Sequence, residues 1–304
     1  MSMMDDHIAA FTLKGGAVRG RILRAASALD AAVGHNRYPE PVANLLAEAL
    51  MISALVAHSL KFKGRIIVQA MGTNDGAVSM LVAETTSEGQ MRAYARFDQD
   101  MLAKILSEHP KPGVQDLTGG GTFALTIDQG QDMERYQSLA AIEGDTFSGI
   151  VEHYFAKSEQ VPTRIQMAVG RLHTPPAKEI LRGGAIMAQR VANDENRADV
   201  QESWTLVEAV MNTLSDEELL DPDLASERLL YRLFHEQGVA MEVAKPISAY
   251  CGCSKQRLHN TLKSFDDQAI EDMIENGVIS AKCEFCHTDY KFTKSDLRPP
   301  KART

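Results

Sequence analysis

Four cysteines are the side chains of this sequence best suited to metal or redox chemistry, and all of them lie within the last 54 residues. They form two close pairs, Cys251-x-Cys253 and Cys283-x-x-Cys286, with 29 residues between the pairs. Four thiolates can complete the tetrahedral shell of a zinc ion, with two ligands from each pair. The sequence therefore predicts one Zn2+ ion held by Cys251, Cys253, Cys283 and Cys286.

The same thiolates would also respond to oxidants. A zinc-bound thiolate is a deprotonated nucleophile, so an oxidant can convert it to sulfenic acid and then to a disulfide, which expels the metal. Metal binding supplies much of the folding free energy of a small domain, on the order of 10 kcal/mol. Oxidation should therefore unfold the domain that carries the cysteines. The alternative is a permanently closed zinc site with a structural role alone, which the spacing does not exclude.

His287 follows the second pair, so that residues 283–287 match the C-x-x-C-H pattern of covalent haem attachment. A haem of this type is attached outside the cytoplasm, but the first residues contain no basic segment followed by an apolar one. Haem attachment would also leave the first cysteine pair without a role. We therefore interpret His287 as a surface histidine beside a complete four-sulfur site.

The overall charge of the chain restricts its partners. The 41 acidic and 32 basic residues give a formal net charge of -9, and such a protein repels polyanions. Nucleic acid or an anionic membrane is therefore not expected as the main partner. The most apolar stretch, residues 43–60, is interrupted by polar side chains and does not have the pattern of a bilayer span. With no secretory signal among the first residues, we expect a cytoplasmic protein.

Residues 1–182 are predicted to form an α+β domain. Apolar residues at helical spacing predict a long buried helix over residues 39–62. The period then changes to that of short strands separated by Gly-rich turns. The predicted strands are residues 65–70, 77–82, 91–97, 122–127, 134–137 and 164–169, and a further helix is predicted over residues 148–157. This pattern indicates an antiparallel sheet with helices instead of a doubly wound parallel fold.

Residues 183–244 are predicted to form an acidic helical linker. The composition changes after Gly183-Gly184, and residues 197–237 hold ten acidic and three basic residues among regularly spaced apolar ones. The pattern predicts two or three amphipathic helices. They could be a permanent bundle packed on the first domain, or a marginally stable layer that is exposed only under some conditions. Residues 245–304 would then form the small zinc domain, with a disordered tail.

The sequence predicts no catalytic or nucleotide-binding site. Residues 15–20 have the glycine spacing of a phosphate loop, but Arg21 and Ile22 stand where Lys and Ser or Thr are needed. Gly119–Gly121 precedes a strand instead of a helix and is predicted to be a flexible loop. A zinc-dependent hydrolase or transferase would need an open zinc position or paired catalytic groups, and the sequence offers neither. A nucleic-acid adaptor would depend on the basic residues near the end of the chain, against its acidic remainder.

Several motifs outside the cysteines resemble one known family. They are Glu134-Arg135-Tyr136-Gln137, Glu143-Gly144-Asp145-Thr146, residues 154–163 with the pattern Tyr-Phe-x-x-Ser-Glu-Gln-x-Pro-Thr, and Tyr290-x-Phe292 after the last cysteine. Together with the C-x-C and C-x-x-C pairs, they resemble the heat-shock protein 33 family of redox-regulated chaperones over nearly the whole chain. The resemblance implies an α+β substrate-binding domain, a helical linker and a C-terminal zinc domain, in the order derived above.

The resemblance also implies a mechanism without enzymatic activity. The reduced, zinc-bound protein would be inactive as a chaperone, and oxidation would form the disulfides Cys251–Cys253 and Cys283–Cys286. Zinc would leave, and the zinc domain would unfold together with the linker. The exposed apolar surface would bind unfolding proteins without ATP and prevent their aggregation during oxidative stress, in a form that usually dimerises.

We expect the client-binding surface to include apolar linker residues that become exposed when the linker loosens. These residues are Trp204, Leu206, Val210, Leu229, Leu233 and Phe234.

The sequence departs from the family's pattern at two places, one near the start of the linker and one near the first cysteine pair. Residues 185–189 run into Arg190-Val191 where the family usually has Leu-Pro, which leaves the join between domain and linker open. Gln256 replaces a common acidic residue, which concerns the tuning of the zinc site.

Overall fold

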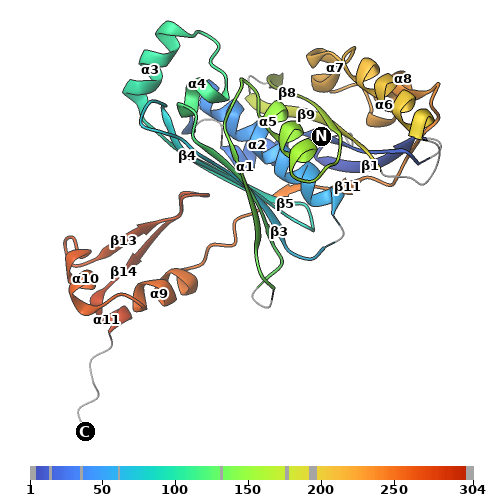
Figure 1. Cartoon of the computed structure of the whole chain (residues 1–304). Helices are drawn as coiled ribbons and strands as arrows, with labels where there is room; N and C mark the ends of the chain where they lie inside the picture. The colour runs from blue at the N-terminus through green and yellow to red at the C-terminus, as the bar shows by residue number, and fades with distance from the viewer. Residues whose placement is uncertain are drawn as a thin grey trace. The chain divides into compact units, whose positions relative to one another are not determined.

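The computed structural model describes residues 5–13, 16–34, 37–60, 62–130, 133–174, 178–191 and 197–298. The chain divides into two compact units, Met1–Ala249 and Tyr250–Thr304. Among the described residues, the first unit contains two mainly antiparallel sheets with most of the helices, and the second contains a short hairpin with three short helices (Figure 1). This is the α+β organisation that the sequence predicts, with all four cysteines in the smaller unit.

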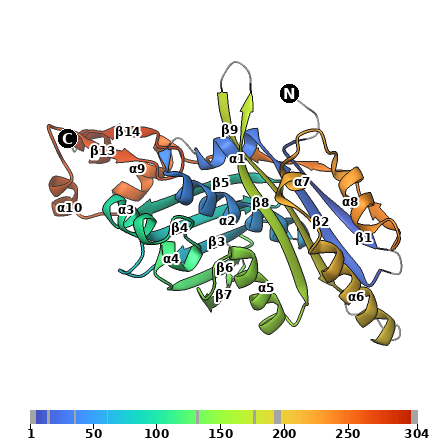
Figure 2. The same ribbon diagram turned by 90° about the horizontal axis from the view of Figure 1, so that it is seen from above.

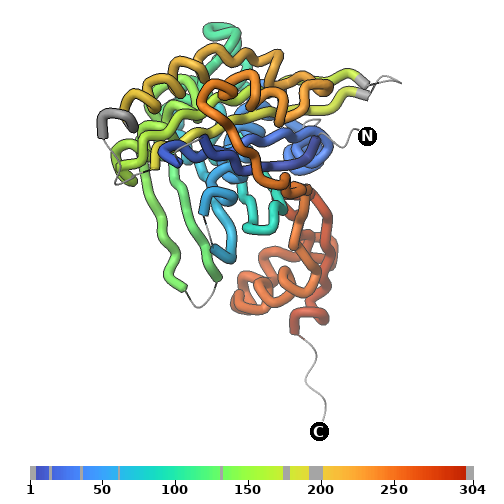
Figure 3. Tube along the Cα trace, turned by 90° about the vertical axis from the view of Figure 1, so that its right-hand side faces the viewer, coloured from blue at the N-terminus to red at the C-terminus, as the bar shows by residue number. Residues whose placement is uncertain are grey.

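One six-stranded sheet, sheet B, has the strand order β12-β5-β4-β3-β6-β7. Neighbouring strands are antiparallel except β12 and β5, which are parallel. The bounds are β3 Arg65–Met71, β4 Val78–Thr86, β5 Gln90–Phe97, β6 Thr122–Asp128, β7 Tyr136–Ala141 and β12 Ser248–Ala249. β6 and β7 form a hairpin that extends from the body of the unit (Figure 3). The strands predicted from alternation are confirmed, with shifts of a few residues at their ends.

A long apolar helix, α2 (Glu40–Ser59), packs against strands of both sheets (Figure 2). Pro41 lies in its first turn, where the missing N–H costs no hydrogen bond. Among the described helices, α2 alone is long and apolar enough to cross a membrane, but 78% of the apolar window is buried inside the protein. Its apolar composition is that of a core helix. The shorter helices of this layer are α1 Ser27–Val33, α3 Gln99–Glu108, α4 Val114–Thr118 and α5 Phe147–Lys157.

The other sheet of the first unit, sheet A, has the strand order β10-β1-β2-β9-β8, and β11 also pairs with β1. The bounds are β1 His7–Leu13, β2 Val18–Ala25, β8 Thr163–Thr174, β9 Lys178–Arg190, β10 Val239–Met241 and β11 Lys245–Pro246. One face of sheet A packs on the core around α2. The opposite face is covered by α6 (Arg197–Met211), α7 (Asp216–Leu220) and α8 (Ser226–Phe234) (Figures 1 and 2). Because successive side chains of a strand point to opposite faces, sheet A is apolar on both.

The side chains between sheet A and the three helices form an apolar cluster of their own, which we call the linker core. Its buried members are Ala9, Phe11, Leu13, Val18, Ile22, Ala168, Ile186, Ala188, Trp204, Val207, Met211, Leu219, Leu229, Leu230, Leu233 and Phe234. The rings of Phe11 on β1 and Phe234 on α8 stack with their centroids 5.7 Å apart. The acidic helices therefore bury their apolar sides on sheet A and leave their charged sides outward.

The linker does not begin after residue 182 as expected, because β9 continues to Arg190. A Cβ atom on Gly184 would lie 2.2 Å from the carbonyl oxygen of Leu219, so this glycine allows close packing and does not mark a flexible join. At the other end, the first unit extends past residue 244 to Ala249, because β10, β11 and β12 add to its sheets. Helices α6–α8 are therefore a layer of the first unit.

Gly119–Gly121 also differs from the expected flexible loop. Gly119 ends α4 in the left-handed conformation, with φ 64°. A Cβ atom on Gly121 would lie 2.1 Å from the carbonyl oxygen of Met71. The segment is a tightly packed turn between α4 and β6, in which glycine is required by conformation and by space.

Two buried arginines tie the connection between α7 and α8 to sheet A. Arg24 on β2 donates hydrogen bonds to the carbonyl oxygens of Leu219 (2.6 Å) and Leu224 (2.9 Å). Arg24 and Arg182 on β9 both reach the Asp221 carbonyl, at 3.3 and 3.4 Å. Burial lowers the pKa of Arg24 to about 10, so its side chain remains charged at neutral pH. The helical layer is thus held by charge-assisted hydrogen bonds as well as by apolar contacts.

The second unit is built around the hairpin of β13 (Ile279–Lys282) and β14 (Asp289–Phe292). Its helices are α9 Lys255–Lys263, α10 Asp267–Asp272 and α11 Lys294–Leu297. The buried apolar cluster of its described part consists of Leu262, Ile270, Ile279, Phe292 and Leu297. A core of this size supplies little stability by itself, so such a unit needs a cross-link or a metal.

Glu48 makes the stability of the first unit depend on pH. It lines a pocket of about 480 Å³ with Asn44 and Asp145, and burial raises its pKa from 4.5 to about 7. Because the folded chain holds this proton more tightly than the unfolded chain, stability falls as the pH rises between these two values. Glu48→Gln should therefore raise the free energy of unfolding by about 2–3 kcal/mol at pH 8 and by less than about 1 kcal/mol at pH 5.

Urea unfolding, followed by far-ultraviolet circular dichroism, measures both values, because this signal includes α2 itself. Glu88→Gln, at an exposed turn position outside this pocket, is the control and should change the free energy of unfolding by less than about 0.5 kcal/mol. An equal effect of Glu48→Gln on the free energy of unfolding at both pH values would contradict the raised pKa of Glu48.

Candidate metal centre

The four cysteine side chains converge within the second unit. Cys251 and Cys253 lie in the segment before α9, and Cys283 and Cys286 lie in the turn between β13 and β14. All four sulfur atoms lie within 4.8 Å of one another. The close approaches include two between different pairs, 3.6 Å from Cys251 Sγ to Cys283 Sγ and 3.3 Å from Cys253 Sγ to Cys286 Sγ. The residues chosen from the sequence as metal ligands therefore form one cluster.

Local hydrogen bonds shape the backbone around each pair. Ser254 caps α9 by accepting a hydrogen bond from the Arg257 amide (3.2 Å), and the Arg257 guanidinium donates to the Gly252 carbonyl within the first pair (2.8 Å). In the second turn, the His287 amide donates to the Cys283 carbonyl (2.8 Å). His287 closes this turn with φ 58°. Its side chain is partly buried and not on the open surface as expected.

Two hydroxyl groups contact the sulfur atoms. The Tyr290 hydroxyl lies 3.1 Å from Cys253 Sγ, and the Thr288 hydroxyl lies 3.2 Å from Cys286 Sγ. Burial raises the pKa of Cys251 to about 12. Burial also opposes the ionisation of Cys286, but hydrogen bonds from the Thr288 hydroxyl and backbone N–H lower the pKa of Cys286 to about 6. The hydrogen bond with Cys253 raises the pKa of Tyr290 to about 12, so this hydroxyl keeps its proton and donates.

The cluster has the donor set of a metal site. Four partly buried thiols so close together cannot all ionise without a cation, because neighbouring negative charges repel one another strongly away from bulk water. A tetrahedral site with metal–sulfur distances of about 2.3 Å has sulfur–sulfur separations of roughly 3.8 Å, close to those observed. Four protein ligands would fill the coordination shell, so the arrangement suits structural binding of a metal ion and offers no open position for a substrate.

The apolar residues expected to bind clients lie in the first unit. Those that belong to the linker core or pack against it are Trp204, Val210, Leu229, Leu233 and Phe234. Leu206 on α6 is instead 43% exposed. Most of the expected surface is therefore covered in this conformation, and its role in client binding stays a prediction.

No sequence pattern singles out Thr288 for the metal centre. Its hydroxyl reaches Cys286 because both residues lie in the turn between β13 and β14, two positions apart. Tyr290 stood out as part of a motif, but the sequence did not show that its hydroxyl contacts Cys253. The available signal for such a contact is a hydroxyl side chain two residues after the last predicted metal ligand.

Comparison with known proteins agrees with this arrangement. A family model described as "Hsp33 protein" matches residues 6–293. A 33 kDa chaperonin of Caulobacter vibrioides is 42% identical over 301 residues, which are 99% of this chain and 97% of the relative. A 33 kDa chaperonin of Escherichia coli is 32% identical over 294 residues, which are 96% of this chain and 94% of the relative. The crystal structure of a 33 kDa chaperonin from Thermotoga maritima has the same fold, with a TM-score of 0.78 at 24% identity and 96% of both chains covered.

The two-sheet unit and the small four-cysteine unit, together with these relatives, place the chain in a class of molecular chaperones. The chain belongs to the Hsp33 family. The resemblance noted in the sequence is confirmed over nearly the whole length.

Removal of one ligand should remove the metal and unfold the second unit. Cys283→Ser leaves three thiols, and the binding of a metal in a small unit of this kind contributes on the order of 10 kcal/mol to folding. We expect the reduced wild-type chain to hold one metal ion, and the variant to hold almost none and to lose the amide NMR signals of β13 and β14. Elemental analysis and the NMR spectrum measure the two effects.

Ser280→Ala, at an exposed position of β13, is the matched control and should keep both the ion and the hairpin signals. A Cys283→Ser chain that retained its metal and a folded second unit would argue against a four-ligand site.

Proposed function

We propose that this chain is a redox-regulated, ATP-independent holdase chaperone that acts in the cytoplasm during oxidative stress. The observation that carries the proposal is the convergence of four partly buried thiols in a unit with a small apolar core. A unit that depends on a metal held by oxidisable ligands loses its fold when those ligands are oxidised. Oxidation of the thiols would thus unfold the second unit.

We propose zinc as the resident ion of the reduced state. Thiolate sulfur is a soft ligand that suits zinc, copper(I) and iron–sulfur clusters. Two short cysteine pairs around a single tetrahedral position are typical of structural zinc. When bound, zinc would cross-link the segment before α9 to the β13–β14 turn, and it would not itself exchange electrons. The electrons lost during oxidation would come from the cysteines.

The proposed oxidation forms the disulfides Cys251–Cys253 and Cys283–Cys286. In each pair, one thiolate attacks hydrogen peroxide, releases hydroxide and becomes a sulfenic acid. The partner thiolate then displaces a second hydroxide and forms the disulfide, so each pair loses two electrons and reduces one peroxide.

The pairing of these disulfides depends on when the second unit unfolds. In the folded unit, sulfurs of different pairs approach to 3.3 and 3.6 Å. After unfolding, the short spacing within each pair keeps its two thiols together, whereas thiols of different pairs would separate. Unfolding at an early stage of oxidation therefore favours disulfides within the pairs, and a peptide map of the oxidised chain tests this assignment.

The proposed client-binding surface is the linker core. The strands between α8 and the second unit, β10, β11 and β12, have three, two and two residues. Strands of this length have little stability alone, so unfolding of the second unit would loosen them and then the helices before them. Loss of α6–α8 would expose apolar side chains of sheet A, including Phe11. Such a surface would bind unfolding proteins and a second copy of the chain, so a homodimer of the oxidised form is part of the proposal.

Oxidation of the reduced full chain with peroxide at mildly raised temperature tests the switch. We expect one zinc ion and four free thiols to disappear together, and the light scattering of a heat-aggregating client to fall only after oxidation. Cys283→Ser should fail to show this reversible, oxidant-dependent change. Retention of zinc while the client aggregates in both states would overturn the proposal and leave a purely structural site.

The Arg24 contacts allow a test of the client-binding surface without oxidation. Arg24→Ala removes the donors to Leu219 and Leu224 and leaves buried carbonyl groups unpaired, which should destabilise the helical layer by about 2–4 kcal/mol. We expect the fluorescence of Trp204 to shift to longer wavelength and the reduced variant to suppress client aggregation in part.

Arg228→Ala, at an exposed position of α8, is the control and should change neither measurement. A variant in which Trp204 becomes exposed without any gain in chaperone activity would show that clients bind elsewhere.

A further inference from the structure

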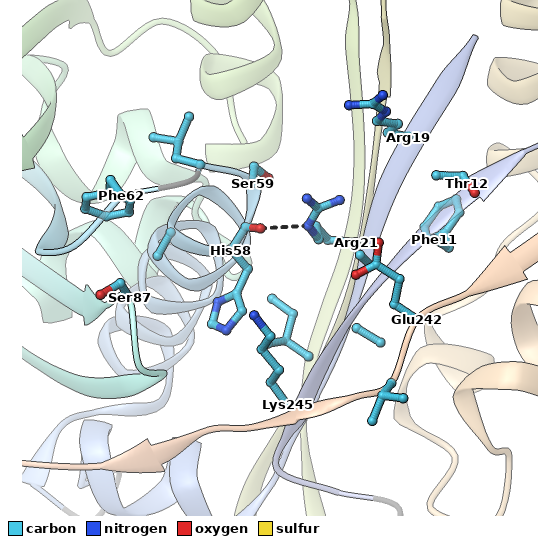
Figure 4. A pocket seen from close by; sticks show the side chains of 16 residues that line it. Phe11, Thr12, Arg19, Arg21, His58, Ser59, Phe62, Ser87, Glu242 and Lys245 are labelled. Carbon is cyan, nitrogen blue, oxygen red and sulfur yellow. Dashed lines mark hydrogen bonds between the residues drawn. The ribbon is translucent and has the colours of Figure 1, made fainter. Parts of the chain in front are cut away.

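A pocket of about 510 Å³ in the first unit has no role in the proposed chaperone cycle. It lies between β1 and β2 of sheet A, the C-terminal turn of α2 and the segment 242–245, on the side of sheet A opposite to the linker core (Figure 4). The segment 242–245 follows β10 and leads toward the second unit. The pocket is therefore built from the body of the first unit and from the segment that joins β10 to β11.

The pocket concentrates positive charge in a chain whose net charge is -9. Arg19, Arg21 and Lys245 line it together with one carboxylate, that of Glu242. Three positive charges and one negative charge give the lining a formal charge of +2. His58 is the remaining titratable residue of the lining, and burial, with smaller effects of Lys245 and Arg21, lowers its pKa.

Arg21 is fixed at the centre of this lining. Its Nε donates to the carbonyl oxygen of His58 at the end of α2 (2.9 Å), and its Nη1 donates to the Gly20 carbonyl (2.7 Å). Figure 4 shows its guanidinium between His58 and Glu242. Within the described part of the chain, Nη2 has no hydrogen-bond partner. A cation held in place with free donors is suited to bind oxygen atoms of an anion.

The rest of the lining is largely apolar. Leu60 and Phe62 follow the end of α2 on one side, and Val243, which is 92% exposed, lies at the rim. Purely inorganic anions would leave these surfaces uncovered. A ligand that combines one charged group with an apolar body would satisfy both parts of the pocket.

We propose that this pocket binds a small amphipathic anion, with a phosphate or carboxylate group between Arg19, Arg21 and Lys245 and an apolar body against Leu60 and Phe62. Phosphate and carboxylate share the oxygen acceptors that guanidinium groups bind in pairs. Lys245 also pairs with Ile8 of β1 in the sheet, so an occupied pocket would fasten the segment 242–245 to sheet A. A regulatory effect of this fastening rests on the proposed function, whereas binding itself does not.

Calorimetric titration of the reduced full chain tests the binding. The probes are phenyl phosphate, 3-phenylpropanoate, the neutral 3-phenylpropanol and inorganic phosphate. We expect one saturable site for at least one of the two organic anions, none for the alcohol, and weaker binding of inorganic phosphate. The tighter of the two organic anions identifies the preferred acid group. Arg21→Ala should weaken binding at least about tenfold, and Glu242→Gln should strengthen it.

Arg19→Ala, at an exposed position, provides a second test that does not depend on Arg21→Ala folding, and it should also weaken binding. Arg228→Ala, outside the pocket, should bind as the wild type does. The proposal is overturned if neither organic anion binds saturably, if the alcohol binds equally well, or if both pocket variants keep the wild-type affinity. No client or oxidant is present, so failure of the chaperone proposal would leave this result unchanged.

Hydrogen exchange tests whether the bound anion fastens the segment 242–245 to sheet A. Exchange of the amides in residues 242–247 should slow when the preferred anion is bound to the wild type, and it should not change in Arg21→Ala. If the exchange rates of the wild type do not change when the anion saturates the pocket, the bound anion does not fasten this segment to sheet A.

Discussion

Burial of the outer face of sheet A under α6–α8 is the constraint on which the rest of this structure depends. Ile8 and Leu23 face the α2 core, while Phe11 and Ile22 face the linker core, so no face of this sheet is suited to water. Its outer face must be covered by its own helices or by another apolar surface. This cover has an apolar cluster of its own, separate from the α2 core, and its loss while the body of the unit stays folded is part of the proposed switch.

The two units are stabilised in different ways, and the proposed redox switch rests on this difference. The first unit has a large core around α2, whereas the described part of the second has a cluster of five buried apolar residues and four thiols. A metal at the thiols would supply what the small core lacks. In the proposed switch, an oxidant would act directly on the second unit, and the short strands β10, β11 and β12 before it would pass the effect to the first.

The elements set by local patterns could be predicted from the sequence, and those set by distant contacts could not. The periodicity of α2 and the alternation of β3–β6 depend on neighbouring residues, and the ligand pairs are recognisable by their short spacing. Gly184 was misleading because a glycine at a flexible join and one under a neighbouring carbonyl look alike until Leu219 is placed. The contact of Thr288 with Cys286 likewise depends on the shape of a turn that the sequence leaves open.

The acidic outer sides of α6–α8 have a consequence for the solubility of chaperone–client complexes. Residues 197–237 carry ten acidic and three basic side chains, a formal charge of -7, and exposed positions such as Glu217 and Glu227 belong to this set. In the folded unit, exposed members of this set such as Glu217 face solvent. Around a bound client, the unfolded segment 197–237 would keep its acidic side chains in water and surround the complex with negative charge, as detergent headgroups do. Mutual repulsion between such particles would keep them dispersed as a colloid.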